Sequence, residues 1–448
     1  MRAYSLLLML SLCIPLTLAC GQEGTGQGGA DTSSDNGSLT DATSQVDTAE
    51  GDTGIDIEED TGPICPEPGS TERPAGLGEA FGTMDAERRK LVFWGGNAGI
   101  PVNCQTATDH IAVLWVYDTV CATFERIETT GGPGPRARGM TIYDPDRDQM
   151  VIFGGRYRGA PSGLYTVYDE VWALDLETYT WTQIQTVGAG PAPRSNPAGA
   201  YNQLTGEMVV FGGNTSNNGL NFGPLNDVWA LNLDSYTWRQ INAQGAKPEA
   251  RLFHSAAVDS ESNLLYIYGG GGANAWTGPF LGDLWVMNLE TGTWEELHSG
   301  GIGAPMGRIW STTAWDKIGK RLLLFGGHDD GMLGNTNDTW SFDPATKVWT
   351  SITEAEEIYS PANGFCNFPK DFTFPNLDAP ERRSGQLAGL DEKRGEWVLF
   401  GGKTDCGLID DVWLFGLGQN SWIKLMGATM GETCNRSDQP QLCVALCQ

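Results

Sequence analysis

The chain has 448 residues and a formal net charge of −28, and 40% of its residues are hydrophobic. This length is enough for a large core, and the strong negative charge argues against a nucleic acid partner. Much of the charge is local, because residues 21–63 contain eleven acidic residues and no Lys or Arg. Such a segment buries too little apolar surface to offset its ordering entropy, so we expect residues 20–63 to form a disordered, extended spacer. Calcium binding is the alternative, but the Asp-x-Asp-x-Asp-Gly spacing of a calcium loop is missing.

Residues 1–19 have the pattern of a signal peptide. Arg2 precedes an apolar run, Leu6–Leu18, that is too short to span a membrane as a stable helix. The run ends in the sequence LTLAC at Cys20, which resembles a bacterial lipobox. This resemblance implies lipidation of Cys20 and an outer-membrane anchor in the bacterial cell envelope. Ordinary cleavage after Ala19 is the alternative.

One unit is then repeated six times. Each copy has a short apolar run ending in Gly-Gly, a loop, a second run opening with Trp, and an aromatic residue nine positions later. The first glycines are at positions 95, 154, 212, 269, 326 and 401. The second-run tryptophans are Trp115, Trp172, Trp229, Trp285, Trp340 and Trp413, and the later aromatics are Phe124, Trp181, Trp238, Trp294, Trp349 and Trp422.

A repeat of 57 to 75 residues is a supersecondary unit. The run before Gly-Gly is apolar at every position, which is typical of a strand covered on both faces. Gly-Gly indicates a sharp turn or a close approach where a Cβ atom would clash, and the later aromatics are suited to fill the wedge between sheets. A fourth segment precedes each Gly-Gly, as in Arg251–Val258. The sequence therefore predicts an all-β fold, a six-bladed β-propeller of four-stranded antiparallel blades.

The spaced signals Gly-Gly, Asp-Val-Trp and Thr-Trp resemble the kelch repeat over about Arg73–Leu425. The resemblance implies a propeller over residues 64–426, with the first strand of each blade nearest the central channel and a Cys-rich tail at residues 427–448. It does not imply one function, because kelch propellers include protein-binding modules, a copper oxidase and sugar-converting enzymes. No residues align with the copper site of the oxidase, and we expect no cofactor.

Eight cysteines remain outside the signal peptide and Cys20. An even number in an exported chain indicates disulfides. We expect Cys366 to pair with Cys406, and at least one bridge to join the start of the chain to its tail. The cysteines available for it are Cys65, Cys104 and Cys121 at the start, and Cys434, Cys443 and Cys447 in the tail. Zinc is the alternative, but there is no Cys-x-x-Cys pair and the His residues are far apart, so we expect no metal.

Two sets of charged residues recur in five of the six copies. An Arg opens the innermost strand, and an acid stands two positions before the second-run Trp. The basic set is Arg136, Arg194, Arg251, Arg308 and Arg383, and the acidic set is Glu170, Asp227, Asp283, Asp338 and Asp411. Both sets belong on one face, because alternate strands of a blade run parallel. A cationic mouth for an anionic ligand is one interpretation. Arg–carboxylate pairing is the other, and we favour it because copy 1 lacks both members, having Leu77 and Val113.

The loops between the Gly-Gly strand and the Trp strand belong to the same face. Their candidate ligand-binding aromatics are Tyr157, Tyr165, Phe222, Trp276 and Phe280, interleaved with Asn, Gly and Ser. Such surfaces suit glycans or peptides, whereas folding of the rings onto the blade is the alternative. His254 on an innermost strand is a further candidate, with a structural role as its alternative. The insertion Glu354–Pro380 adds more aromatics to this face.

We therefore predict an exported, lipid-anchored, monomeric binding module that recognises a protein or glycan through its long-loop face. The alternative is a periplasmic sugar-converting enzyme resembling kelch sialic-acid epimerases, although no catalytic residue is assigned. An enzyme should have a deep axial pocket with an unpaired acid or a His of perturbed pKa. A binding module should have a broad, aromatic-rich face, and a purely structural envelope protein should have neither feature.

Overall fold

A computed structural model describes residues 65–66, 71–99, 108–129, 131–160, 162–219, 221–275, 277–329, 334–355, 379–404 and 407–429. The chain divides into residues 1–61 and residues 62–448, and all of the described residues belong to the second unit. Over these ranges the regular elements are strands, which form six four-stranded antiparallel sheets and two smaller ones. The predicted all-β class and the four-stranded antiparallel sheets are confirmed.

Each four-stranded sheet is described from its innermost to its outermost strand. The innermost strands are β1 (Phe81–Asp85), β5 (Met140–Asp144), β11 (Ala198–Asn202), β15 (Ser255–Asp259), β19 (Thr312–Asp316) and β24 (Leu387–Asp391). The second strands are β2 (Lys90–Trp94), β6 (Gln149–Phe153), β12 (Glu207–Asn214), β16 (Leu264–Gly270), β20 (Arg321–Asp329) and β25 (Glu396–Phe400).

The outer half of each sheet has the same regularity. The third strands are β3 (Leu114–Asp118), β9 (Val171–Asp175), β13 (Pro224–Asn232), β17 (Leu281–Asn288), β21 (Gly334–Asp343) and β28 (Val412–Gly416). The outermost strands are β4 (Thr123–Ile127), β10 (Trp181–Ile184), β14 (Thr237–Ile241), β18 (Thr293–His298), β22 (Val348–Thr353) and β29 (Ser421–Met426). The small sheets comprise β7 (Arg156–Tyr157) with β8 (Thr166–Val167), and β23 (Arg383–Ser384) with β26 (Lys403–Thr404) and β27 (Gly407–Leu408).

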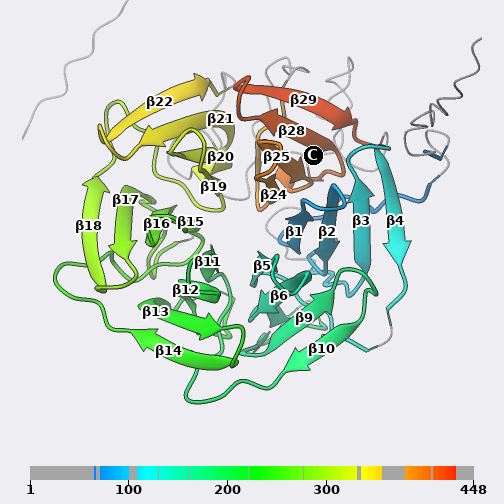
Figure 1. The fold of residues 1–448 in the computed structure, drawn as a ribbon, viewed down its shortest axis with the longest axis horizontal. Coiled ribbons are helices and arrows are strands. Elements are labelled where there is room, and N and C mark those ends of the chain that lie inside the picture. The colour runs from blue at the N-terminus through cyan, green and yellow to red at the C-terminus, as the bar shows by residue number, and fades with distance from the viewer. Residues whose placement is uncertain are drawn as a thin grey trace, which may run out of the picture. The chain divides into compact units, whose positions relative to one another are not determined.

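The six sheets, numbered 1 to 6 in chain order, stand radially around one axis (Figure 1). Their innermost strands contact one another in the closed cycle β1, β5, β11, β15, β19, β24 and back to β1. Among the described strands, each four-stranded sheet takes its strands from one continuous stretch of chain. The first and last sheets are therefore joined by packing rather than by an exchanged strand.

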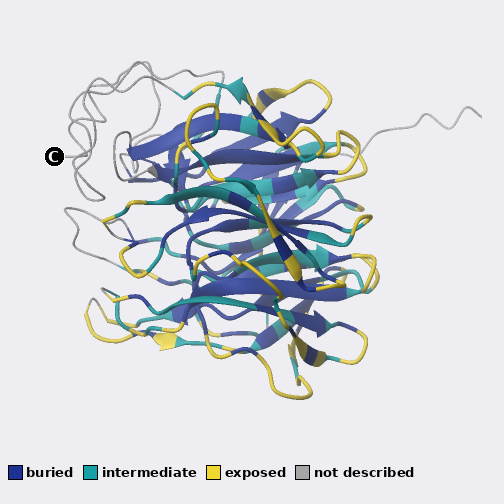
Figure 2. Cartoon of the chain, turned by 90° about the vertical axis from the view of Figure 1, so that its left-hand side faces the viewer, coloured by how far each residue is buried: buried dark blue, intermediate teal, exposed yellow. Residues whose placement is uncertain are grey.

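The two ends of the axis differ in their connections. Short turns join the first strand to the second and the third to the fourth, and we call this end the short-turn face. The loops from second to third strands and the links between sheets lie at the other end, the long-loop face. Strands are mostly buried and the connections are exposed (Figure 2). An Asp or Asn ends each innermost strand. Its side chain accepts a hydrogen bond from the main-chain N–H of the residue two positions later, as Asp259 does from Glu261.

The Gly-Gly pair lies where two sheets meet. Gly212 and Gly213 have φ of +60° and +102°, and a Cβ atom on Gly212 would lie 2.9 Å from the main-chain oxygen of Arg251 in the next sheet. The N–H of Gly213 donates a hydrogen bond to that oxygen at 3.0 Å. The first glycine of every copy has a main-chain oxygen of the next sheet in this position. For Gly401 this atom is the oxygen of Leu77. The predicted close approach is confirmed, and the approaching segment is the backbone of the neighbouring sheet.

The late aromatic residue of each copy packs against the preceding sheet, as expected for a wedge filler. Each ring meets the aromatic ring that directly precedes Gly-Gly on the second strand of that sheet, with centroids 4.8 to 5.6 Å apart. The pairs are Trp181 with Trp94, Trp238 with Phe153, Trp294 with Phe211, Trp349 with Tyr268, Trp422 with Phe325 and Phe124 with Phe400. These tilted and edge-on contacts are the favourable arrangement for aromatic rings.

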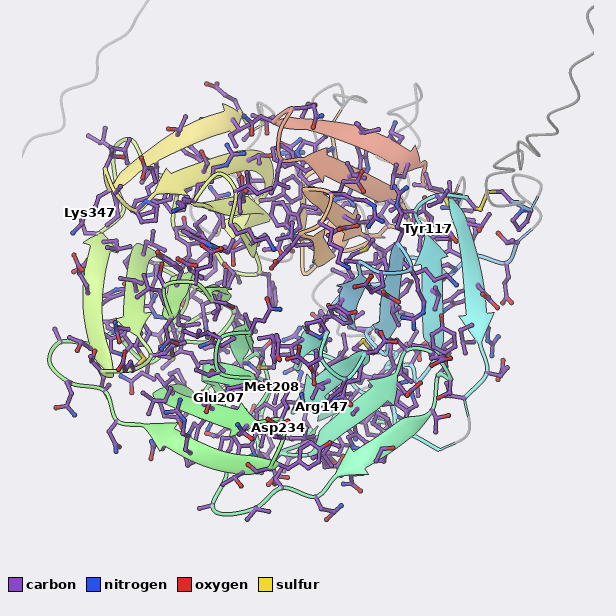
Figure 3. All side chains as sticks on the ribbon, viewed as in Figure 1. Tyr117, Arg147, Glu207, Met208, Asp234 and Lys347 are labelled. Atoms are coloured by element: carbon purple, nitrogen blue, oxygen red, sulfur yellow. A yellow bond between two sulfur atoms is a disulfide. The ribbon has the colours of Figure 1, made fainter. Side chains whose placement is uncertain are left out.

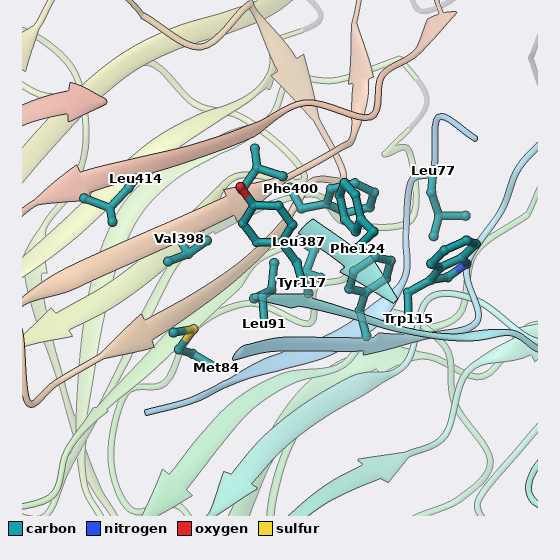
Figure 4. Close-up of a cluster of buried hydrophobic side chains, with 12 residues drawn as sticks. Leu77, Met84, Leu91, Trp115, Tyr117, Phe124, Leu387, Val398, Phe400 and Leu414 are labelled. Carbon is teal, nitrogen blue, oxygen red and sulfur yellow. The ribbon is translucent and has the colours of Figure 1, made fainter. Parts of the chain in front are cut away.

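The Phe124–Phe400 pair closes the ring between sheets 1 and 6. It lies in a cluster of buried side chains drawn from both sheets (Figure 4). The N–H of Gly402 donates to the oxygen of Leu77 at 2.8 Å, and Arg73 forms a salt bridge with Asp410 at 3.0 Å.

One disulfide, Cys65–Cys121, lies within the start group. The other predicted disulfide positions, Cys104, Cys366, Cys406 and the tail cysteines, fall outside the described residues. A bridge from start to tail therefore stays a prediction.

We expect Gly212→Ala to lower the free energy of unfolding by about 3 kcal/mol, because strain at positive φ is compounded by a clash with the Arg251 oxygen. Gly206→Ala is the matched control, since Gly206 has a φ of +63° but nothing within 4 Å of an added Cβ atom. Urea denaturation of both variants measures the difference. Equal losses would contradict the explanation from close approach.

Candidate functional site

The five predicted Arg residues are buried and bonded within their own sheets. Arg251 donates two hydrogen bonds to Asp283, both at 2.8 Å, and one each to the main-chain oxygens of Gly269 and Glu249. The indole N–H of Trp285 donates to the same carboxylate at 2.7 Å. The guanidinium therefore ties the first, second and third strands together.

The arrangement recurs in the other copies that have an Arg. The bidentate pairs are Arg194–Asp227, Arg251–Asp283, Arg308–Asp338 and Arg383–Asp411, and Arg136 makes a single bond to Glu170. In copy 1, Leu77 is buried and Val113 packs against its cluster, so an apolar contact replaces the ion pair. These contacts support the structural interpretation of the Arg ring rather than a cationic mouth.

The predicted aromatic residues divide between core and surface. Tyr165 and Phe222 are buried, and Phe222 packs edge-on against Phe253 at 5.4 Å. Tyr157 and Phe280 are half-buried. Trp276 and most of the insertion Glu354–Pro380 fall outside the described residues. Tyr165 and Phe222 therefore fold back onto the blades, as the alternative interpretation of these aromatic residues predicted.

His254 lies inside the fold, where its ring meets Phe211 edge-on at 5.1 Å. Burial, and then the positive charge of Arg251, lower the pKa of His254 to about 3. The residue is therefore neutral at physiological pH. Its packing matches the structural alternative considered for it from the sequence.

A ring of left-handed residues surrounds the axis at the long-loop end, and we call it the axial ring. Its members stand two positions after the Arg ring and are Glu79, Arg138, Asn196, Phe253, Trp310 and Gly385, with φ between +53° and +64°. The main-chain N–H of Arg138 donates to the oxygen of Glu79, and that of Glu79 to the oxygen of Gly385. Three further steps of the same kind link Asn196 to Arg138, Trp310 to Phe253, and Gly385 to Trp310. These bonds hold neighbouring sheets together at the axis.

Side chains of the axial ring meet across the axis. Arg138 donates two hydrogen bonds to Glu79, both at 2.6 Å. The same guanidinium lies 5.0 Å from the ring of Trp310 and 5.7 Å from that of Phe253, on the far side of the cycle. Burial raises the pKa of Glu79, but Arg138 outweighs it and holds that pKa below its ordinary value.

Further cationic groups gather beside this pair. We call Arg138, Arg156, Arg158 and His110 with Glu79 the cationic cluster. The guanidinium groups of Arg156 and Arg158 lie 3.9 and 4.4 Å from the ring of Tyr165. His110 lies beside Tyr165, at 6.3 Å between centroids, and its Nδ1 accepts a hydrogen bond from the N–H of Arg158 at 3.4 Å. Strand β7 and the loops of sheets 1 and 2 thus bring these groups together.

Buried donors on Arg138, Arg156 and His110 have no hydrogen-bond partner among the described residues. They are Nη1 of Arg138, Nε of Arg156 and Nε2 of His110. Burial lowers the pKa of His110 to about 4, so its ring is neutral, and with Nδ1 accepting a bond the proton lies on Nε2. Burial, and then repulsion by Arg138, lower the pKa of Arg156 to about 9. The cluster is therefore built to accept negative charge.

The sequence carried a partial signal for this cluster. Arg156 and Arg158 follow Gly154-Gly155 directly, in the same loop as the candidate Tyr157. Glu79, His110 and Arg138 carried none, because each occurs in a single copy of the repeat. Within the described ranges, no group of three or more His, Cys, Asp or Glu residues could hold a metal ion. No helix able to cross a bilayer occurs in this part of the chain.

The radial sheets and their Gly-Gly junctions define a β-propeller, and sequence comparison identifies its family. The family model described as the KLHDC2/KLHL20/DRC7 Kelch-repeats domain matches residues 65–205 and 166–369. The chain belongs to the kelch-repeat family.

Several relatives match part of the chain. Acyl-CoA-binding domain-containing protein 5 of Arabidopsis thaliana is 28% identical over 279 residues, which are 60% of this chain and 38% of that protein. Kelch domain-containing protein 1 of Mus musculus is 28% identical over 241 residues, which are 49% of this chain and 56% of the relative. The chain thus matches 38% to 56% of the length of these relatives.

A solved structure has the same fold. The structure of YjhT superimposes with a TM-score of 0.56 and 13% identity, covering 79% of this chain and 98% of that one. At this level of identity the likeness shows the fold alone.

The buried His254 predicts a pH dependence of stability. Because its pKa is about 3 in the folded chain and its ordinary value is 6.5, acid protonates the unfolded chain first. Stability should therefore fall as the pH drops below about 6.5 and level off below about 3. We expect protonation of this residue alone to lower the free energy of unfolding by about 2 kcal/mol between pH 7 and pH 5.

The variant His254→Leu should lose that part of the slope, and urea denaturation across this pH range measures it. His298→Leu, which alters a half-buried residue on β18, is the control and should keep the slope. If His254→Leu and the unaltered chain have parallel profiles, the explanation is wrong.

Proposed function

We propose that the chain is an exported, lipid-anchored, six-bladed kelch propeller that acts as a binding module. Its ligand is a protein or glycan that presents an anionic group to the long-loop end of the axis. The observation that carries this proposal is Arg156, which is 4% exposed. Among the described residues, no carboxylate forms a salt bridge with it, and the charge of Glu79, which is bonded to Arg138, attracts it only from a longer distance.

Burial of a cation without a paired anion is costly, and proteins normally avoid it. The five buried residues of the Arg ring follow that rule, as Arg251 does with Asp283. The exception at Arg156 coincides with partnerless donors on Arg138 and His110. An arriving carboxylate, sulfate or phosphate would satisfy these donors and neutralise the charge. The free protein would then carry the cost that the ligand relieves.

The surroundings of the cluster fit a ligand with a ring or an extended backbone. Tyr157 is half-buried beside His110, with centroids 5.9 Å apart, and Tyr165 forms the floor under two guanidinium groups. Aromatic and Arg side chains dominate the energetics of binding sites. Loops raised on a rigid scaffold are also the common location of such sites.

Binding is favoured over catalysis by the geometry at the two ends of the axis. An enzyme should combine a deep axial pocket with a His of perturbed pKa. His110 has a perturbed pKa, but the axial cavity is lined by residues of the short-turn face, at the opposite end of the innermost strands. His110 also presents a donor rather than a free base to its surroundings. A sugar-converting enzyme is therefore the second choice.

The anchor is proposed from the sequence at Cys20, which lies outside the described residues. A lipid on Cys20 would hold the propeller at the membrane through the acidic spacer at residues 21–63. We expect Cys20→Ser to abolish incorporation of a labelled fatty acid and release the protein from the membrane fraction of a bacterial host. Labelling that persists in the variant would contradict the anchor.

The cationic cluster predicts that Arg156→Met loses ligand binding and gains stability. The substitution removes a buried charge that has no salt bridge and keeps the length of the side chain, so the free energy of unfolding should rise by about 1 kcal/mol. Glycan-array and pull-down screening of the unaltered chain identifies the ligand. Titration calorimetry should then show roughly a tenfold loss of affinity or more in Arg156→Met.

Arg194→Met is the matched control within the Arg ring. It leaves Asp227 without its bidentate partner, so stability should fall by about 3 kcal/mol. A loss of stability in both variants would assign Arg156 a structural role and overturn the proposed site. Retained affinity in Arg156→Met would place the ligand elsewhere on the face.

A further inference from the structure

A cavity of about 490 Å³ lies at the short-turn end of the axis. Two layers of the innermost strands line it. The deeper layer consists of Gly82, Thr141, Gly199, Ala256, Thr313 and Ala388, and the layer nearer the mouth of Met84, Tyr143, Tyr201, Val258, Trp315 and Leu390. None of the axial-ring residues lines it. Its volume is in the range of small-molecule sites.

The deeper layer combines small side chains with two hydroxyl groups. Gly and Ala in four of the six strands leave room where the strands converge. Thr141 and Thr313 lie in sheets 2 and 5, which are opposite each other in the cycle. Their hydroxyl oxygens have no hydrogen-bond partner among the described residues. The depth of the cavity is therefore a space between small side chains, and both hydroxyl oxygens are buried in its wall.

The mouth of the cavity is held by polar contacts between neighbouring turns. Lys317 pairs with Glu392 at 2.8 Å between sheets 5 and 6, and Lys393 pairs with Glu87 between sheets 6 and 1. Arg147 of the β5–β6 turn reaches Asp234 of the β13–β14 turn (Figure 3). Further bonds are Arg88 with Asp148, Tyr201 with Asp146, and Asn202 with Asn263. Such a collar pre-organises the mouth, which lowers the entropic cost of binding.

The charge of the mouth is negative. Both lysines that line it are paired with glutamates, whereas in the described part of the chain the exposed carboxylate of Glu261 forms no salt bridge. Asp259 lies beside it at the end of β15. Glu87 and Glu392 also line the mouth, but each is paired with a lysine.

We propose that this cavity binds a small organic cation carrying a quaternary or protonated ammonium group. Aromatic faces and nearby carboxylates attract such cations, and Tyr143, Tyr201 and Trp315 line the walls. Trp315 is held by a stacked contact with Tyr266, with ring planes 10° apart. The ammonium group would lie near Glu261, with its apolar substituents against the rings.

This site is independent of the proposed function, because it shares no residue with the cationic cluster. The opposite signs of charge at the two ends would select ligands of opposite charge. An anion is disfavoured at the short-turn end, since it would meet Glu261 and Asp259.

Choline is the probe, and its uncharged carbon analogue 3,3-dimethylbutan-1-ol is the matched ligand control. Ligand-observed NMR titration of the full chain at constant ionic strength measures both affinities. We expect saturable binding of choline that is roughly tenfold tighter than binding of the analogue. Equal affinities, or no binding of choline, would overturn the proposal. Tighter binding of a neutral sugar such as galactose would also overturn it in favour of a carbohydrate pocket.

Glu261→Gln should weaken choline binding roughly threefold without affecting the fold, because the residue is exposed. Glu290→Gln is the control, an exposed glutamate on the β17–β18 turn of the same sheet and face that does not line the cavity. Tyr201→Ala should weaken choline more than Tyr201→Phe, since the aromatic face is the recognising element. Arg156→Met should leave choline binding unchanged. An equal loss in both glutamate variants would indicate general screening and contradict a site at Glu261.

Discussion

The junction between Gly-Gly and the main chain of the next sheet is the contact on which the rest of the structure depends. In sheets 3 and 4 the oxygen of Arg251 accepts a bond from Gly213, while its guanidinium binds Asp283 and the oxygen of Gly269. Arg251 thus fixes both the distance between two neighbouring sheets and the alignment of the strands within its own sheet. The main-chain hydrogen bond is the more general of these two contacts. In copy 1, the oxygen of Leu77 accepts it although Leu77 has no charged side chain. Side-chain pairing can be replaced by apolar packing, whereas the close approach cannot tolerate a Cβ atom.

The features that could be predicted from the sequence are those that recur in several copies of the repeat. Pairing of the Arg and acidic sets followed from their joint absence at Leu77 and Val113, and the wedge role of the late aromatics from their regular spacing. The cationic cluster could not be predicted in this way, because its members occur once each. The salt bridge between Glu79 and Arg138 joins two copies at the axis, and periodicity cannot show which non-repeated side chains meet. Burial of Tyr165 was equally hidden, since two of its contacts, His110 and Asn217, lie in loops of other copies.

Charge is distributed along the axis rather than around it. At the long-loop end, the buried guanidinium of Arg156 lies beside the Arg138–Glu79 pair, and at the short-turn end Glu261 and Asp259 border an aromatic-walled cavity. The packed axial ring belongs to the long-loop end, and none of its residues lines the cavity. A low-dielectric body that separates charges of opposite sign maintains a field along its length. Ligands approaching the two faces would therefore be sorted by charge before any specific contact forms.

The axial ring shows how such a scaffold separates stability from recognition. Every member has a left-handed backbone, which only glycine adopts without cost, yet sheet 6 alone uses glycine there, at Gly385. The others, including Arg138 and Trp310, each accept strain of about 1 kcal/mol or more. Hydrogen bonds between neighbouring members hold the backbone in this conformation whatever the side chain is. The side chain is thereby free to vary from copy to copy. Residues other than glycine, which are strained in this backbone conformation, are expected where their side chains bind the ligand rather than stabilise the fold.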